Sequence, residues 1–122
     1  MTYLVRDYDE ALAYFVEKLG FRCLEDTRIS EDKRWVLVSP GDEHGATLLL
    51  ARAKNEVEAA AIGRQAGGRV FLFLYTDDFA ADYARYTRRG VAFREAPRNE
   101  PYGTVAVFAD LYGNLWDLIQ KK

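Results

Sequence analysis

One carboxylate, Asp117, lies inside an apolar run at positions 115–119, near the end of the chain. Successive side chains of a strand point to opposite faces of a sheet, so Trp116 and Leu118 share one face and Asp117 lies on the other. If that second face lines a cavity that excludes water, burial raises the pKa of Asp117 and makes it a candidate general acid or base. Two other interpretations stay open: an edge strand with Asp117 in water, or a carboxylate satisfied by Thr47 or a tyrosine hydroxyl.

The composition of the chain indicates an ordinary globular protein and excludes several functional classes. Its 122 residues are 49% hydrophobic and 30% charged, and the net charge is −2, so disorder is not expected. The arginines are scattered rather than gathered in a stripe, so we expect no nucleic-acid partner. No apolar run is long enough to span a bilayer, so we expect no membrane partner either.

The single cysteine, Cys23, cannot form a disulfide within the chain. Together with the absence of a signal peptide at Met1, this predicts a cytoplasmic protein. Cys23 follows Phe21 on a predicted strand, which favours a buried, unreactive thiol.

The hydrophobic periodicity predicts two similar series of elements joined by a connector over 52–68. Asp7 and Asp9 offer caps for a helix that ends at Gly20, and Asp77 and Asp78 offer caps for a second helix. We expect strands over 3–5, 21–26, 34–39, 46–51, 69–75, 91–96, 104–108 and 115–120, a short helix over 56–62, and a loop over 97–103. The strand at 69–75 is apolar throughout, which predicts cover on both of its faces.

The two series superimpose at an offset of about 70 positions. This offset places Asp7 on Asp77 and Gly20 on Gly90, and it pairs Thr47 with Asp117. We therefore predict an α+β fold of two tandem βαβββ modules, residues 1–51 and 69–122, within one structural domain. The modules would form a curved mixed sheet with its helices on the convex side and a concave ligand groove.

The order of elements and several segments resemble the vicinal oxygen chelate superfamily, which includes glyoxalase I, bleomycin resistance proteins and extradiol dioxygenases. The segments that carry the resemblance lie at positions 5–15, 19–21, 76–78, 89–91 and 110–118. The most specific of them is the aspartate-turn-glycine-asparagine element before the last strand. The resemblance does not imply one reaction, because this fold hosts enzymes and plain binding proteins alike.

In metal-dependent members of that superfamily, each module supplies one ligand from its first strand and one from its last strand. By the resemblance, these positions are Thr47 and Asp117 in the last strands, Phe71 in the second module, and a position at or just before Met1. Only Asp117 suits a divalent ion, so we expect no metal and no cofactor. The only histidine, His44, falls in a predicted turn, where we expect it to be solvated.

The predicted groove is apolar and aromatic and suits a small, partly aromatic molecule. Its expected lining is Trp35, Thr47, Leu49, Phe71, Phe73, Tyr75, Leu115, Asp117 and Ile119, with Tyr102 in a loop at the mouth. The strand of Trp35 does not by itself show which face of the sheet this side chain lies on. Tyr102 could close over a ligand, or it could pack only within its own loop.

Two functions fit these residues. The first is metal-independent binding of a small molecule, as in the bleomycin resistance branch, and the second is a glyoxalase-like lyase or isomerase that uses Asp117 as metal ligand or general acid/base. A domain with a vestigial groove is a third, weaker alternative. The sequence therefore does not decide whether the protein is an enzyme. Relatives are commonly dimers, which implies a homodimer.

Overall fold

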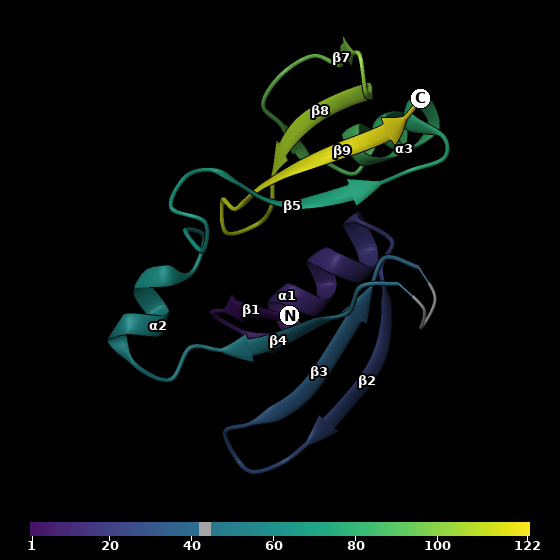
Figure 1. Cartoon of the computed structure of the whole chain (residues 1–122). Helices are drawn as coiled ribbons and strands as arrows, with labels where there is room; N and C mark the ends of the chain where they lie inside the picture. Colours follow the sequence, from purple (N-terminus) through teal and green to yellow (C-terminus); the bar gives the residue numbers. More distant parts are fainter. Residues whose placement is uncertain (42–44) are drawn as a thin grey trace. The chain divides into compact units, whose positions relative to one another are not determined.

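Two separate mixed sheets, each with helices, make up the α+β fold that the sequence predicts. The computed structural model describes residues 1–41 and 45–122 (Figure 1). The chain divides into unit 1, Met1–Ile62, and unit 2, Gly63–Lys122, and each unit is described by itself. The boundary falls within the stretch 52–68, and the helix in that stretch contacts the first strand of unit 1.

Unit 1 is a four-stranded sheet with a helix after its first strand. Its elements are β1 Thr2–Val5, α1 Tyr8–Ala13 continued by the π-helix η1 Tyr14–Lys18, β2 Arg22–Arg28, β3 Arg34–Ser39, β4 Leu48–Arg52 and α2 Glu56–Ala61. The strand order is β1-β4-β3-β2, with β1 parallel to β4 and the other pairs antiparallel.

The helix of unit 1 forms where its capping residue and apolar stripe predict it. The Asp7 carboxylate accepts a hydrogen bond from the Glu10 amide at 2.8 Å, as an N-cap residue does. Ala11, Phe15 and Leu19 are buried at helical spacing. The helix packs this stripe on the sheet, with the Phe15 ring edge-on to Tyr3 of β1 at 5.1 Å between centroids.

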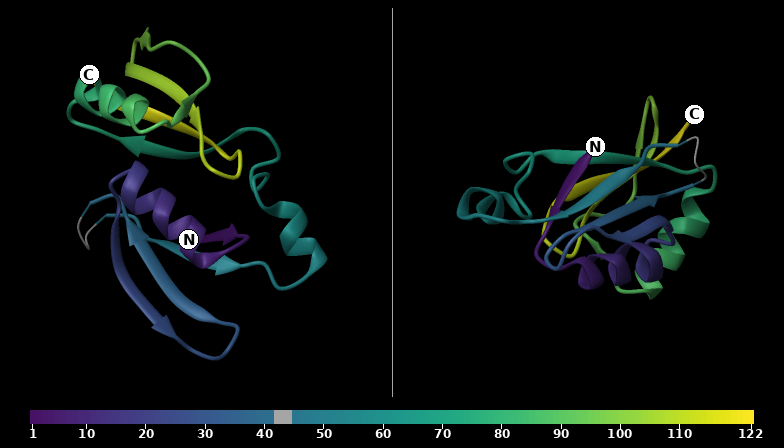
Figure 2. Two further views of the ribbon diagram at one scale, coloured as in Figure 1. Left: turned by 180° about the vertical axis from the view of Figure 1, so that it is seen from behind. Right: turned by 90° about the horizontal axis from the view of Figure 1, so that it is seen from below.

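Unit 2 repeats this arrangement with one additional strand. Its elements are β5 Val70–Tyr75, α3 Phe79–Arg88, β6 Ala92–Phe93, β7 Arg98–Glu100, β8 Gly103–Ala109 and β9 Leu115–Lys121. The strand order is β5-β9-β8-β6, and β7 also pairs with β8. The view from behind in Figure 2 shows α3 against one face of this sheet.

An aromatic cluster joins α3 to the sheet of unit 2. The Phe108 and Trp116 rings are stacked at 5.7 Å between centroids, and Phe108 also contacts Phe93 and Tyr86 of α3. Phe108 is fully buried and Trp116 nearly so. This cluster fixes which face of β8 and β9 is turned toward the helix.

The predicted strand at 91–96 forms over a shorter range, and the predicted loop at 97–103 was wrong. Only Ala92 and Phe93 pair with β8 there, and the supposed loop contains β7, which pairs with β8 farther along. The physical reason is Pro97, which has no amide hydrogen to donate to a ladder. Pro97 therefore divides the edge of the sheet into two short strands.

Two burial predictions were also wrong. Cys23 is exposed rather than buried, because β2 is an edge strand whose side chains are mostly in solvent. β5 is not covered on both faces: Phe73 is 59% exposed and Tyr75 is 56% exposed, whereas Leu74 between them is buried. An unbroken apolar run therefore does not mean two-sided burial in this strand.

No helix in residues 1–41 and 45–122 is long and apolar enough to cross a membrane.

Candidate functional site

Asp117 lies at the centre of β9, between two strands. Its cross-strand neighbours are Phe73 on the parallel strand β5 and Val107 on the antiparallel strand β8. The adjacent residues Trp116 and Leu118 are buried on the side of α3. Asp117 therefore lies on the face of the sheet turned away from the helix, as alternation along β9 predicts.

We call this surface the Asp117 face. It is the side of the β5–β9–β8 sheet opposite α3, and the strand registers place on it Phe73, Tyr75, Val105, Val107, Leu115, Asp117, Ile119 and, at the end of β9, Lys121. Apart from Asp117 and Lys121, these residues have apolar or aromatic side chains, so Asp117 is the one carboxylate among them.

The Asp117 carboxylate is incompletely satisfied. Its Oδ1 atom is buried and has no hydrogen-bond partner in the described part of the chain, so the idea that Thr47 or a tyrosine satisfies this oxygen is not supported. Burial raises the pKa of Asp117, the positive charge of Arg98 lowers it, and the negative charge of Glu95 raises it, with a net upward shift. A buried, unpaired acceptor of this kind is costly to the fold.

Three charged residues form a cluster beside Asp117, which we call the Arg98 cluster. The Arg98 guanidinium donates to Glu95 at 2.8 Å and to Glu100 at 2.8 Å. Hydrogen bonds with Glu95, Glu100 and Tyr102 raise the pKa of Arg98. Arg98 is thus already committed to two carboxylates and is not a dedicated partner for Asp117.

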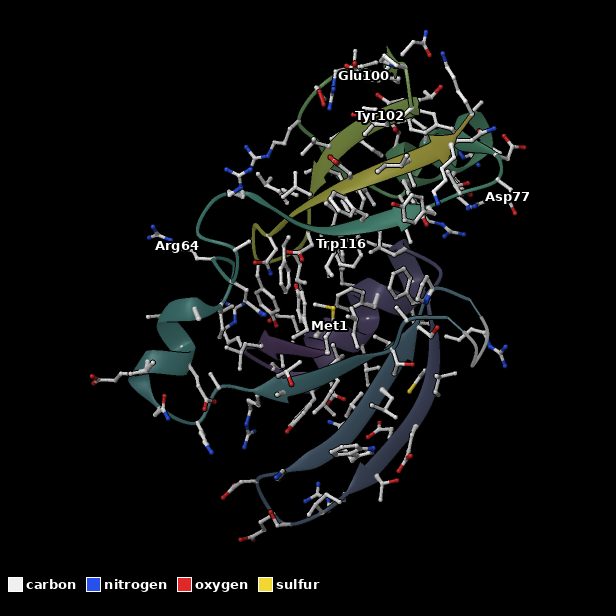
Figure 3. The ribbon with its side chains drawn as sticks, in the orientation of Figure 1. Met1, Arg64, Asp77, Glu100, Tyr102 and Trp116 are labelled. Atoms are coloured by element: carbon white, nitrogen blue, oxygen red, sulfur yellow. The ribbon has the colours of Figure 1, made fainter. Side chains whose placement is uncertain are left out.

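Exposed aromatic side chains surround this region. Phe73 and Tyr75 are more than half exposed on the Asp117 face, and Tyr102 is 54% exposed at the hairpin between β7 and β8. The Lys121 ammonium lies 4.5 Å from the centroid of the Tyr75 ring. Figure 3 shows Glu100 and Tyr102 at this hairpin. In such a site the exposed rings can stack on a flat molecule, and the carboxylate can accept a hydrogen bond from it.

Among the other predicted site residues of unit 2, Leu115 lies on the Asp117 face and Phe71 lies next to a register irregularity. Phe73 rather than Phe71 pairs with Asp117, and the register of Val70 with Leu115, if continued without the irregularity between Val70 and Leu72, would place Leu72 there. The repeat alone does not show it, because an offset counted along the sequence assumes identical strand registers in both modules.

The predicted site residues of unit 1 lie on its own sheet. Leu37 pairs with Leu49 and Val36 with Leu50, and Val36 and Leu50 are fully buried. Trp35 alternates with Val36, so it shares a face with Leu49, which the sequence alone did not decide. Thr47 immediately precedes β4, and its carbonyl accepts a hydrogen bond from the Met1 amino group at 3.0 Å. A groove shared by the two modules stays a prediction.

Within unit 2, the cross-strand neighbours of Asp117 supply no ligand for a divalent metal ion. Phe73 and Val107, the neighbours beside it in the sheet, have no ligand atoms in their side chains. No group of three or more His, Cys, Asp or Glu side chains that could hold a metal occurs among the residues with described positions. His44 lies outside the described residues.

Sequence reasoning missed Glu95, Arg98, Glu100 and Val107. A loop was expected at 97–103, and side chains in a loop cannot be assigned to the face of a sheet. The alternation of Arg98 and Glu100 was the available signal, but only the pairing of β7 with β8 brings these charges near Asp117.

Comparison with known proteins gives matches along nearly the whole chain. A family model described as Glyoxalase/Bleomycin resistance protein/Dioxygenase superfamily matches residues 1–118. An uncharacterized protein from Shewanella frigidimarina (strain NCIMB 400) is 57% identical over 118 residues, which cover 96% of this chain and 87% of that protein.

Two solved structures are similar in both fold and sequence. UcmS2 is 34% identical, with a TM-score of 0.83 and coverage of 98% of this chain and 93% of that chain. TnmS3, an antibiotic binding protein from Streptomyces sp. CB03234, is 32% identical, with a TM-score of 0.78 and coverage of 100% and 93%.

Proposed function

The chain belongs to the Glyoxalase/Bleomycin resistance protein/Dioxygenase superfamily, and we propose that it binds a small, partly aromatic molecule without using a metal. The observation that carries this proposal is the Asp117 face, where exposed Phe73 and Tyr75 flank a carboxylate with an unpaired, buried oxygen. Rings of this kind give a flat ligand contact area, and the carboxylate gives it an orienting polar contact. The similarity to TnmS3, an antibiotic binding protein, supports the same class of function.

We expect a panel of planar aromatic compounds to contain molecules that raise the melting temperature of the protein. A ligand at 100 times its dissociation constant adds about 2.7 kcal/mol to the free energy of unfolding. Replacing Phe73 with alanine should weaken the best compound roughly three- to tenfold, because one aromatic contact contributes about 0.5–1.5 kcal/mol. Titration calorimetry measures this loss.

The matched control is Val57→Ala, which also truncates an exposed apolar side chain but on α2 of unit 1. It should leave the dissociation constant unchanged. If no compound shifts the melting temperature, or if both variants weaken binding equally, the Asp117 face is not the binding surface.

We further propose that binding needs no metal, because Asp117 has only apolar cross-strand neighbours. Elemental analysis of the purified protein should find far less than one equivalent of zinc, nickel, iron or manganese. Treatment with a chelator should leave the affinity for the best aromatic compound unchanged. Stoichiometric metal that disappears in Asp117→Ala would contradict this prediction.

The raised pKa of Asp117 favours a second candidate function, a lyase or isomerase that uses this residue as general acid or base. Such an enzyme would transfer a proton between the Asp117 carboxyl group and a carbon or oxygen atom of its substrate. To test for catalysis, the best compound is incubated with the protein, recovered and examined by mass spectrometry and chromatography. A lyase changes the mass of the compound, whereas an isomerase changes only its chromatographic retention. An unchanged compound supports the binding function.

The predicted groove between the modules, the predicted homodimer and the cytoplasmic location are parts of the same proposal. The unpaired Cys23 suits a reducing compartment. Exposed Trp35 in unit 1 and exposed Phe73 in unit 2 offer apolar surface that a ligand or another copy would cover.

A further inference from the structure

Resting on the proposed function, we infer that the Asp117 face selects aromatic molecules that carry a cationic N–H group, which donates a hydrogen bond to the Asp117 carboxylate. The Asp117 face would bind neutral and anionic molecules with similar rings more weakly. The inference rests on three features of unit 2: the unpaired acceptor, the local balance of charge, and the exposed ring beside the acceptor.

The unpaired acceptor indicates which group a ligand must supply. Oδ1 of Asp117 is buried and has no hydrogen-bond partner in the described residues. The side chains of Phe73 and Val107, its cross-strand neighbours, cannot donate a hydrogen bond. A ligand that fits here must therefore bring a donor, because an acceptor would leave the oxygen unpaired and add repulsion.

The charges near Asp117 favour a cation as that donor. Arg98 is ion-paired with Glu95 and Glu100 at 2.8 Å each, so the Arg98 cluster together with Asp117 has three carboxylates and one guanidinium. With the Lys121 ammonium on the same face included, three negative and two positive charges leave a net charge of −1 when all are ionised. A cation gains from this surplus, whereas an anion is repelled. Hydrogen bonds between ionised partners are also about twice as strong as neutral ones.

The position of Phe73 indicates where the aromatic part of the ligand lies. Phe73 pairs with Asp117 across the strands and is 59% exposed, so its ring is free on the same side of the sheet as the carboxylate. Tyr75 follows on the same face and is contacted by Lys121. A flat molecule can thus stack on Phe73 while its cationic group reaches Asp117, and the ring also attracts the cation.

Three probes with similar fused rings test this inference. They are 9-aminoacridine, a cation near neutral pH, acridone, which is neutral, and anthracene-9-carboxylate, which is an anion. Near pH 7 we expect 9-aminoacridine to bind at least about tenfold more tightly than acridone, and the anion to bind most weakly, as charge-assisted hydrogen bonding requires. Fluorescence titration and calorimetry measure the three dissociation constants.

Asp117→Asn removes the charge with little change of shape. It should weaken 9-aminoacridine about tenfold or more and acridone less than about twofold. The matched control is Asp77→Asn, which makes the same chemical change at an exposed aspartate before α3 and should alter neither constant. Glu95→Gln is the second variant: it leaves Asp117 in place, removes one of the two carboxylates paired with Arg98 and should weaken 9-aminoacridine several-fold.

The outcomes separate this inference from the proposed function. If acridone binds as tightly as 9-aminoacridine, and Phe73→Ala weakens both, the protein binds aromatic molecules but the inferred selectivity is wrong. If Asp117→Asn and Asp77→Asn have equal effects, Asp117 is not the acceptor. If no probe binds and Phe73→Ala converts a dimer to a monomer, a second copy covers the face, and both proposals fail.

Discussion

Replacing Asp110 with alanine is expected to lower the free energy of unfolding by about 3 kcal/mol, because it leaves buried donors without an acceptor. Asp110 is buried, and its Oδ1 accepts from the Tyr112 and Asn114 amides at 3.0 Å each. Its Oδ2 accepts from the Trp116 indole at 2.9 Å. One carboxylate therefore holds the turn before β9 and also anchors the aromatic cluster that packs against α3.

Urea unfolding followed by tryptophan fluorescence measures the effect of this substitution. Trp35→Phe is a useful background, because Trp116 then reports on unit 2 alone. Asp110→Asn keeps one acceptor oxygen and should lose roughly half as much stability. The exposed control Asp77→Ala should change stability by less than about 0.5 kcal/mol. A loss below about 1 kcal/mol in Asp110→Ala would show that the turn does not depend on this carboxylate.

Replacing Asp117 with leucine is expected to have the opposite effect and to stabilise the fold by about 1–2 kcal/mol near pH 7. The substitution removes a buried oxygen that has no partner in the described residues and puts an apolar side chain between Phe73 and Val107. Binding of the cationic probe should be lost in the same variant. Residues of functional sites often lower the stability of the fold while they support binding, and this pair of results would place Asp117 among them.

The stabilisation by Asp117→Leu should increase as the pH rises from about 4 to neutral. Burial raises the pKa of Asp117, so the folded protein holds this proton more tightly than the unfolded chain does. The cost of the charged carboxylate is therefore fully present above the folded pKa. It falls as the pH drops through that value and is absent below the unfolded pKa, near 4.

Urea unfolding of both proteins at several pH values measures this dependence. The advantage of Asp117→Leu should be largest near neutral pH and should shrink toward pH 4. If leucine destabilises the protein at neutral pH, Asp117 makes favourable contacts and is a structural residue. Asp77→Leu gives the reference for adding the same side chain at an exposed position.

Local signals in the sequence were sufficient for most of the helices and strands. Asp7 and Asp78 cap their helices as acidic residues at these positions should, and β3 coincides with its predicted range of 34–39. The turn before β9 was readable because Gly113, with φ 96°, has a backbone conformation that disfavours other residues. These features depend on residues close together in the chain, which is why the sequence reveals them.

The sequence by itself determined that the fold is α+β with a duplicated module, and that Asp117 lies opposite Trp116 and Leu118 on its strand. Both follow from periodicity, because alternation within a strand is a local property. Only the tertiary structure decided that Phe73 pairs with Asp117 across the strands and that Arg98 forms ion pairs with two glutamates. Strand register and the break of an edge strand at Pro97 depend on pairing between distant segments, and the spacing along the chain does not encode that pairing.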